Sequence, residues 1–294
     1  MAPEVESNPA AAKTFKTILD GIEKIPALPV VLNKILNVLE DPKSNVAGVS
    51  HLIKTDQAMS IRILKIVNSS YYGFSRQIST INQAIVILGF NAVKSLALSA
   101  TVVQIFGTRG GDGFDLPGFW EHSIAAGVFA DVVARRVNYP LPEECFCAAI
   151  LHGVGKLILD QYLHDPFVQA VAAAKKRRIF LQKAEQEILG IDHCRAGAML
   201  AEKWNLPLQL QECIRYYPHP EHAKINKVQV ALVHVGDYAA REMVCGDPGD
   251  TAKPHLSDSA KTILKLTAGD VDDLIRNAEK ELSKVEDILS TLSE

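Results

Sequence analysis

Apolar residues recur at the three- and four-residue spacing of amphipathic helices along most of this chain. Ser44, Asp56 and either Ser79 or Thr80 precede such runs and are suited to cap helix N-termini. Asp-Pro at 41–42 interrupts the first run, as expected at a helix end. The helices expected in the first third of the chain cover about residues 30–39, 46–53, 57–67, 81–88 and 92–106.

Residues 107–118 contain several glycines and a proline, which predicts a connector between two lobes. Helical spacing then resumes and continues to the next glycine-rich break, at residues 246–250. The expected helices cover about residues 120–137, 142–163, 166–176, 185–204, 207–216 and 227–244. Alternating strand patterns and fixed-period repeats are absent from the sequence, so we predict an all-α bundle in two lobes.

The tail from Ser257 is again helical in pattern. Its apolar residues near heptad spacing are Ile275, Leu282, Val285, Leu289 and Leu292. We expect this tail to dock on the main body. A dimerising helix is the alternative, although about two heptads are too few to hold a coiled coil alone.

Composition narrows the choice of compartment and partner. The net charge of −3 gives no overall attraction to nucleic acid or to an anionic membrane. The sequence lacks an apolar stretch long enough for a membrane span, and its first residues are unlike a signal peptide. Five irregularly spaced cysteines favour free thiols over a disulfide framework. We therefore expect a soluble cytoplasmic protein.

Histidines on the expected helices of the second half are candidates for chemistry. They are His122, His152 and His193, and Asp237 follows on a late helix. Neutral imidazoles and a carboxylate around a shared cavity suit zinc, iron or manganese. None of these residues forms a compact His-x-x-x-His pair, and each histidine taken alone is more typical of a hydrogen-bonded core or surface residue than of a metal ligand.

An ordered set of motifs resembles the HDOD family, the HD-related output domains. The resemblance extends over about residues 20–245. The motifs are IPALP at 25–29, LIKTD at 52–56, ILKIVNSSYYG at 63–73, ISTINQAIVILG at 78–89, FWEHS at 119–123, AILHGVGKLIL at 149–159, Asp192-His193, GA at 197–198 and WNLP at 204–207.

The resemblance implies an all-α fold whose second lobe is similar to HD-superfamily phosphohydrolases. It implies an extension at 1–19, a first lobe at 20–107, a connector at 108–118, an HD-like lobe at 119–245 and C-terminal helices at 246–294. Carried over by position, the implied metal ligands are His122, His152, His193 and Asp237. The role of His219, which is displaced from the histidine pair of many relatives, stays open.

Gly153 stands where the family's His-Asp pair has its aspartate. A glycine has no carboxylate with which to bridge two cations, so a two-metal hydrolase is disfavoured. One iron, zinc or manganese ion and a metal-free histidine cluster both remain open. The motif of HD-GYP phosphodiesterases is also absent.

We therefore predict a non-catalytic signal transduction module that binds a signalling protein or a small ligand in trans. The alternative is a metal-dependent phosphohydrolase acting on a nucleotide or cyclic dinucleotide. A nucleic-acid-binding regulator is a third possibility, with little support from composition. The sequence leaves the oligomeric state open.

Three further segments have two interpretations each. Lys156 is either a phosphate contact or, as we slightly prefer, a residue at a helix surface. Residues 68–73 form either a recognition surface facing the second lobe or, as preferred, a helix C-terminus ending at Gly73. The basic run at 175–178 is either a nucleic-acid-binding patch or, as preferred, a solvated helix end.

Overall fold

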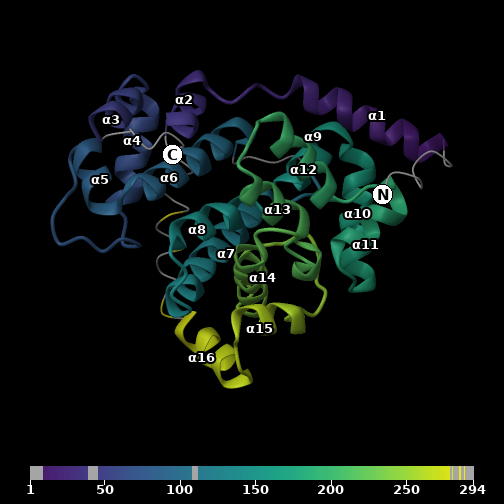
Figure 1. Cartoon of the computed structure of the whole chain (residues 1–294). Helices are drawn as coiled ribbons and strands as arrows, with labels where there is room; N and C mark the ends of the chain where they lie inside the picture. The colour runs from purple at the N-terminus through teal and green to yellow at the C-terminus, as the bar shows by residue number, and fades with distance from the viewer. Residues whose placement is uncertain are drawn as a thin grey trace.

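The computed structural model describes residues 9–38, 46–107, 112–278, 280, 285 and 288. Every regular element in these residues is helical, which confirms the all-α prediction. Figure 1 shows α2 to α5 gathered at one end of the molecule, separated from the larger group of helices that follows. The helix α6 leads from one group to the other and packs against α8.

The first lobe is built from short helices with local caps. Asp56 accepts a hydrogen bond from the Met59 amide, and Thr80 accepts one from the Gln83 amide, as the sequence predicted. Ser44 lies outside the described residues. The helices are α2 (Val30–Val38), α3 (Val46–Lys54), α4 (Gln57–Val67), α5 (Ile81–Leu88) and α6 (Phe90–Phe106).

The second lobe contains more helices than the sequence predicted. The helix expected over 142–163 is broken at His152-Gly153, and the one expected over 185–204 is broken before His193. The elements are α7 (Leu116–Arg136), α8 (Pro142–Leu151), α9 (Val154–Tyr162), α10 (His164–Arg177), α11 (Leu181–Leu189), α12 (His193–Lys203), α13 (Leu208–Tyr216), the short 3₁₀ helix η1 (Pro220–His222) and α14 (Lys227–Glu242).

The long helices α7 and α14 lie along each other at the centre of this lobe. Their approach depends on Gly236, because a Cβ atom there would lie 2.3 Å from the Ala126 carbonyl oxygen. Asp115 caps α7 by accepting from the Gly118 amide, so the predicted 108–118 connector overlaps the start of this helix. This central pair supplies two of the candidate ligands.

The first helix, α1 (Pro9–Lys24), belongs spatially to the second lobe. It packs against α9 and α12, and Lys203 donates to the carbonyl oxygens of Ile22, in its last turn, and of Ile25, just beyond its end. The predicted boundary at residue 20 therefore falls inside a helix. The sequence pattern predicts no helix here, so α1 is found only in the structure.

Residues 68–73 combine both interpretations made from the sequence. Asn68 ends α4 and its side-chain amide donates to the Leu64 carbonyl, while Gly73 has φ of +60°. Tyr71 nevertheless reaches the second lobe, where its ring stacks on Phe146 at 5.3 Å. The helix end is thus also a contact between the two lobes.

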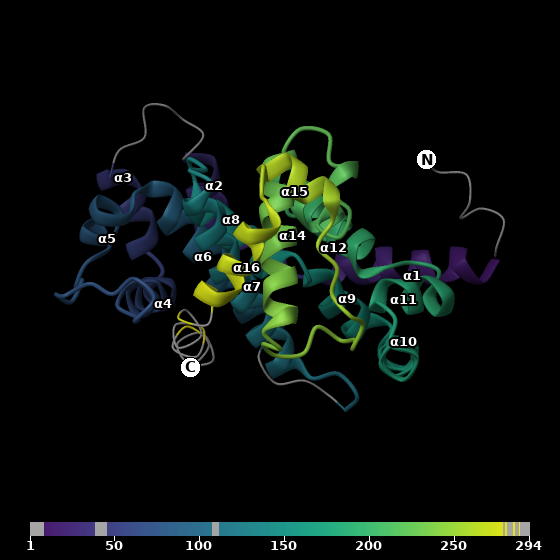
Figure 2. The same cartoon turned by 90° about the horizontal axis from the view of Figure 1, so that it is seen from below.

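The C-terminal helices α15 (Asp258–Leu264) and α16 (Ala268–Ala278) pack on α14, and α16 also touches α7. Figure 2 shows α16 lying beside these two helices. Docking on the main body is thus confirmed for this part of the tail. Leu282, Leu289 and Leu292 lie outside the described residues.

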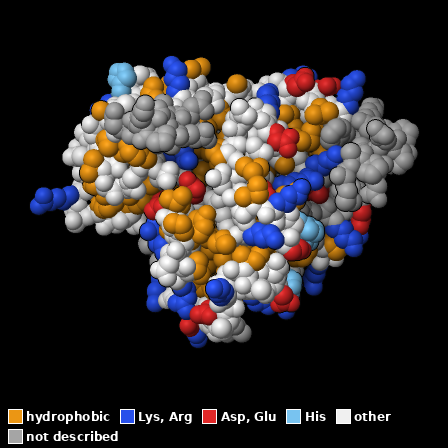
Figure 3. All heavy atoms as spheres, viewed as in Figure 1, with side chains coloured by type: hydrophobic (Ala, Val, Ile, Leu, Met, Phe, Trp, Pro, Cys, Tyr) orange, Lys and Arg blue, Asp and Glu red, His pale blue; other side chains and the backbone are white. Residues whose placement is uncertain are grey.

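The cysteines and the basic residues lie in different environments. All five cysteines are buried and free. The basic run at 175–178 ends α10, where Lys175 pairs with Asp247. On the face shown in Figure 3, lysine and arginine side chains are interspersed with acidic ones. Within the described part of the chain, no helix is long and apolar enough to cross a membrane.

Candidate metal centre

Three of the four predicted ligands meet in the interior of the second lobe. His122 comes from α7, Asp237 from α14, and His152 from the break between α8 and α9. One potential ligand atom from each lies within 4.8 Å of the other two, and all three residues are buried. The close packing of α7 on α14 places His122 opposite Asp237, although the two residues are 115 positions apart in the sequence.

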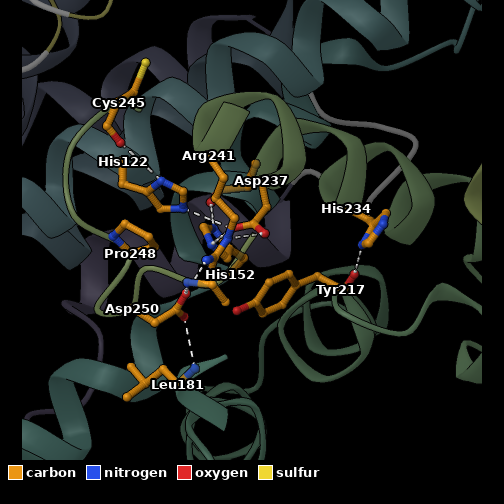
Figure 4. Close-up of polar contacts among 12 residues, drawn as sticks. His122, His152, Leu181, Tyr217, His234, Asp237, Arg241, Cys245, Pro248 and Asp250 are labelled. Atoms are coloured by element: carbon orange, nitrogen blue, oxygen red, sulfur yellow. Dashed lines mark hydrogen bonds and ion pairs between the residues drawn. The ribbon is translucent and has the colours of Figure 1, made fainter. Parts of the chain in front are cut away.

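A single carboxylate oxygen is the common point of this cluster. Asp237 Oδ1 lies 2.9 Å from His122 Nε2 and 3.4 Å from His152 Nε2 (Figure 4). Ligands bonded at about 2.0–2.1 Å in a tetrahedral site are about 3.3 Å apart, so these spacings suit one ion. We call His122, His152 and Asp237 the histidine–aspartate cluster.

The other ring nitrogens face carbonyl oxygens. His122 Nδ1 lies 3.3 Å from the Cys245 oxygen, and His152 Nδ1 contacts the Ala149 oxygen. With an ion bound, a proton on each Nδ1 would leave each Nε2 lone pair free to bind that ion, in place of the hydrogen bond that His122 Nε2 makes to Asp237 Oδ1. His152 Nε2 makes no well-aligned hydrogen bond although it is buried. Two imidazole nitrogens and one carboxylate oxygen therefore surround a common point, and this donor set fits one divalent cation.

Burial and charge set the protonation of the cluster. Burial lowers the pKa of His122 to about 4, against the opposing effect of Asp237. Burial alone would raise the pKa of Asp237, but the Arg241 charge and the His122 hydrogen bond hold that pKa well below its usual range. Near neutral pH the cluster consists of a neutral His122 and an ionised Asp237, the forms that bind metals.

Gly153 leaves no room for the missing carboxylate as the helices now pack. A Cβ atom at this position would lie 2.8 Å from Phe119 Cε2 and 3.7 Å from Lys156 Nζ. A neighbouring cation and an aromatic ring therefore surround the place of a bridging carboxylate. A second metal ion does not fit these residues.

Lys156 is completely buried, so its interpretation as a surface residue is wrong. The side chain points into the lobe because α9 is covered by α1, α10 and α12. Its Nζ donates to the Pro248 carbonyl at 2.9 Å and lies 5.9 Å from the centre of the Phe119 ring. Burial, together with the Arg241 charge, lowers its pKa.

Arg241 was missed by the sequence reasoning. Its Nε donates to Asp237 Oδ2 at 3.0 Å and its Nη1 donates to Asp250 Oδ1 at 2.9 Å. Only 8% of the side chain is exposed. The residue lies four positions after Asp237 on α14, a spacing that could have revealed the pair. This cation occupies the Asp237 oxygen that a second metal would need.

His193 lies outside the histidine–aspartate cluster. Its Nδ1 lies 2.6 Å from Glu185 Oε2, and its Nε2 lies 2.8 Å from the Tyr217 hydroxyl. His193 can pack closely against α9 only because residue 155 is a glycine, since a Cβ atom there would lie 1.8 Å from the His193 carbonyl oxygen. His193 contacts the cluster indirectly, through the Tyr217 ring, whose centre is 4.5 Å from that of His152.

A cavity of about 320 Å³ adjoins the cluster. Asp237, Arg241, Tyr217 and His193 line it, and His219 and Glu221 also contribute to its wall. His219 is an exposed wall residue whose Nδ1 lies 3.5 Å from Glu221 Oε1, and it does not belong to the cluster. A small polar ligand can therefore contact the buried ion pairs directly.

Comparison with known proteins is consistent with this arrangement. The model of the HDOD domain matches residues 25–220, which is most of the chain. The chain belongs to the HDOD family. The matched region contains His122 and His152, whereas Asp237 and Arg241 lie beyond its end.

Solved HDOD-like structures share the fold. An HDOD domain protein of unknown function from Geobacter sulfurreducens is 23% identical, with a TM-score of 0.81 over 98% of this chain and 99% of that chain. A protein from Shewanella amazonensis, provisionally described as a phosphohydrolase, is 25% identical, with a TM-score of 0.73 over 94% and 98% of the two chains. A provisionally described signal transduction protein from Marinobacter aquaeolei is 19% identical, with a TM-score of 0.77 over 97% and 66%.

Curated relatives of this HDOD chain are longer than it is. An uncharacterized protein of Treponema pallidum is 24% identical over 74% of this chain and 42% of its own length. The uncharacterized protein YuxH of Bacillus subtilis is 41% identical over 21% of this chain and 15% of its own length. The chain thus spans less than half the length of these relatives.

Proposed function

We propose that this HDOD protein is a non-catalytic regulatory module for signal transduction that binds a partner protein or a small ligand in trans. The observation that carries the proposal is that two buried side-chain cations, Lys156 and Arg241, lie where a two-metal site would need anionic ligands. Gly153 provides no carboxylate, Lys156 lies beside it, and Arg241 holds one oxygen of Asp237. Two-metal hydrolysis needs those anionic positions free for the ions.

The binding part of the proposal is supported by the cavity and by the exposed apolar side chains of the first lobe. The cavity offers polar groups for a small ligand beside a buried ion pair. Val30 and Val86 of the first lobe are 68% and 71% exposed, and apolar atoms gather over this lobe in Figure 3. Such surfaces are typical of contacts with a partner protein.

A metal-dependent phosphohydrolase is the second candidate, favoured by the histidine–aspartate cluster. The donors fit one ion, held by His122, His152 and Asp237. A bound ion would supply Lewis acidity to a phosphoryl oxygen and a more acidic water. The chain's own residues would then orient a substrate in the cavity through Arg241 and Tyr217.

Metal analysis and turnover separate the two candidates. Protein purified without an affinity tag is assayed for bound metals, and then for hydrolysis of nucleotides and cyclic dinucleotides with manganese, zinc or iron. We expect at most one ion per chain and no turnover. His152→Ala should abolish metal binding, whereas His219→Ala, outside the cluster, should leave it intact.

The opposite result would overturn the proposal. Metal-dependent hydrolysis that His152→Ala abolishes and His219→Ala preserves would make the protein an enzyme. An HDOD module as proposed would instead show no hydrolysis in any of the three proteins.

A further inference from the structure

Residues 245–257 form a strap that crosses the buried site after α14 ends. Near its start, the Cys245 carbonyl oxygen lies 3.3 Å from His122 Nδ1. At its far end, the Ser257 amide donates to His234 Nε2 at 3.0 Å. Figure 4 shows Cys245, Pro248 and Asp250 of this strap beside the histidine–aspartate cluster. One continuous segment therefore covers groups from α7, α9 and α14.

The strap supplies an acceptor to each of the two buried cations, and Asp237 supplies the other acceptor of Arg241. Lys156 Nζ donates to the Pro248 oxygen, and Arg241 Nη1 donates to Asp250 Oδ1. Within the described part of the chain, Lys156 makes no ion pair with a carboxylate closer than 4 Å. Lys156 thus depends on the strap for its acceptor, and Arg241 depends on it for one of its two carboxylate partners.

Asp250 is held as a bound anion would be held. Its side chain is 1% exposed, and besides Arg241 it accepts from the Leu181 amide at the first residue of α11, at 3.0 Å. A guanidinium group and the free amides of a helix N-terminus are the usual partners of an oxyanion. The carboxylate also lies in the wall of the 320 Å³ cavity, together with Arg241.

The strap is also anchored by apolar and polar contacts at other positions: Cys245 and Leu256 are buried in the hydrophobic core, and the Thr251 hydroxyl donates to the Lys175 oxygen. Asp247 pairs with Lys175, and its amide donates to the Gly118 oxygen at 2.8 Å. Gly246 and Gly249, on either side of Asp247-Pro248, both have positive φ values, of +62° and +93°. Pro254 and His255 of the strap line the cavity as well. A ligand in the cavity would therefore touch both the strap and the helices beneath it.

We propose that the strap is a built-in pseudo-ligand: Asp250 occupies an oxyanion site at Arg241 and the start of α11, and an anionic ligand entering the cavity displaces it and releases the strap. This inference rests on the proposed binding function and names the ligand as one that bears a phosphate-like oxyanion. Release of the strap would uncover the face between α7 and α14, and this change is what a partner detects.

Inorganic phosphate is the probe, used at constant ionic strength with chloride as the reference anion. Hydrogen exchange of the full chain is measured over residues 245–257. Saturating phosphate should increase strap exchange several-fold in the unmodified protein. Unchanged or slower strap exchange at saturation would overturn the inference, and so would an absence of phosphate binding.

Asp250→Asn provides the second measurement. The asparagine oxygen can still accept from the Leu181 amide, but the competing negative charge at Arg241 is removed. We expect about tenfold tighter phosphate binding, equivalent to about 1.4 kcal/mol, and faster strap exchange without phosphate. Equal affinity in this variant and the unmodified protein would overturn the inference.

Glu221→Gln is the matched control. Glu221 lines the same cavity and loses the same charge, but it is about half exposed and lies outside the strap. Its phosphate affinity should change less than twofold, and an effect as large as that of Asp250→Asn would show general charge attraction and overturn the inference. If Asp250→Asn does not fold, the exchange of the unmodified protein decides alone. None of these measurements depends on turnover, which tests the proposed function separately.

Discussion

Arg241 and Arg135 make the same kind of contacts in two different environments. Each donates from Nε to the aspartate four residues earlier, Asp237 or Asp131, at 3.0 or 2.8 Å. Each also reaches a second carboxylate at 2.9 Å. The Arg241 side chain is 8% exposed, whereas that of Arg135 is 53% exposed. Because Asp131 and Asp237 are both buried, the two networks differ mainly in the burial of the guanidinium group and of its second carboxylate.

Arg241→Met should strongly destabilise the protein. The methionine retains much of the apolar stem but leaves Asp237 and Asp250 as buried charges without their main partner. Removing one member of a buried pair costs about 3–5 kcal/mol. The same change at Arg135 should cost about 1 kcal/mol, because its head group is solvated and Asp131 keeps the Tyr71 hydroxyl.

Urea unfolding of both variants and of the unmodified protein measures the two losses. The comparison requires equal m-values, since otherwise the free energies of unfolding are not comparable. In thermal unfolding, a loss of 3–5 kcal/mol should lower Tm by about 6–20 °C for a chain of this size. Losses for the two variants within about 0.5 kcal/mol of each other would refute the argument from burial.

Three other substitutions test the packing and charge of the site. Gly155→Ala should lower the free energy of unfolding in urea by about 3 kcal/mol or more, because its Cβ would lie 1.8 Å from the His193 backbone oxygen. Gly269→Ala is the control and should be almost neutral, because the nearest atom to its Cβ would be 3.9 Å away. Similar losses of stability in the two variants would contradict this reasoning. In chelator-treated protein, native His122 stays neutral down to about pH 4, whereas unfolded His122 takes up a proton near pH 6.5. The unfolded state therefore binds more protons in this range, and the free energy of unfolding should decrease by about 3 kcal/mol as the pH falls from 6.5 to 4. His122→Gln should make this pH dependence shallower, and an unchanged slope would argue against the assignment. If the cations block the site, Gly153→Asp should show no turnover with manganese, because the new carboxylate would meet Lys156. Metal-dependent turnover in this variant would show that the cations do not block the site.

Capping residues and apolar spacing determine much of the secondary structure without reference to tertiary contacts. Asp56 and Thr80 cap helices where the sequence predicted them, because a cap bonds to an amide only three residues away. The family motifs also identified His122, His152 and Asp237 as neighbours in space, although they come from three separate elements. The absence of a carboxylate at Gly153 follows from residue identity alone.

The break at His152-Gly153 and the burial of Lys156 were decided by tertiary structure. Apolar spacing continues across the break, so the local pattern was compatible with one long helix. Lys156 is buried because α9 is covered by segments distant in the chain, and its partner Pro248 lies 92 residues away. Likewise, His193 binds Glu185 and Tyr217 instead of joining the cluster. Local sequence determines which helices form and where their caps lie, whereas the partner of a buried charge depends on which distant segment covers it.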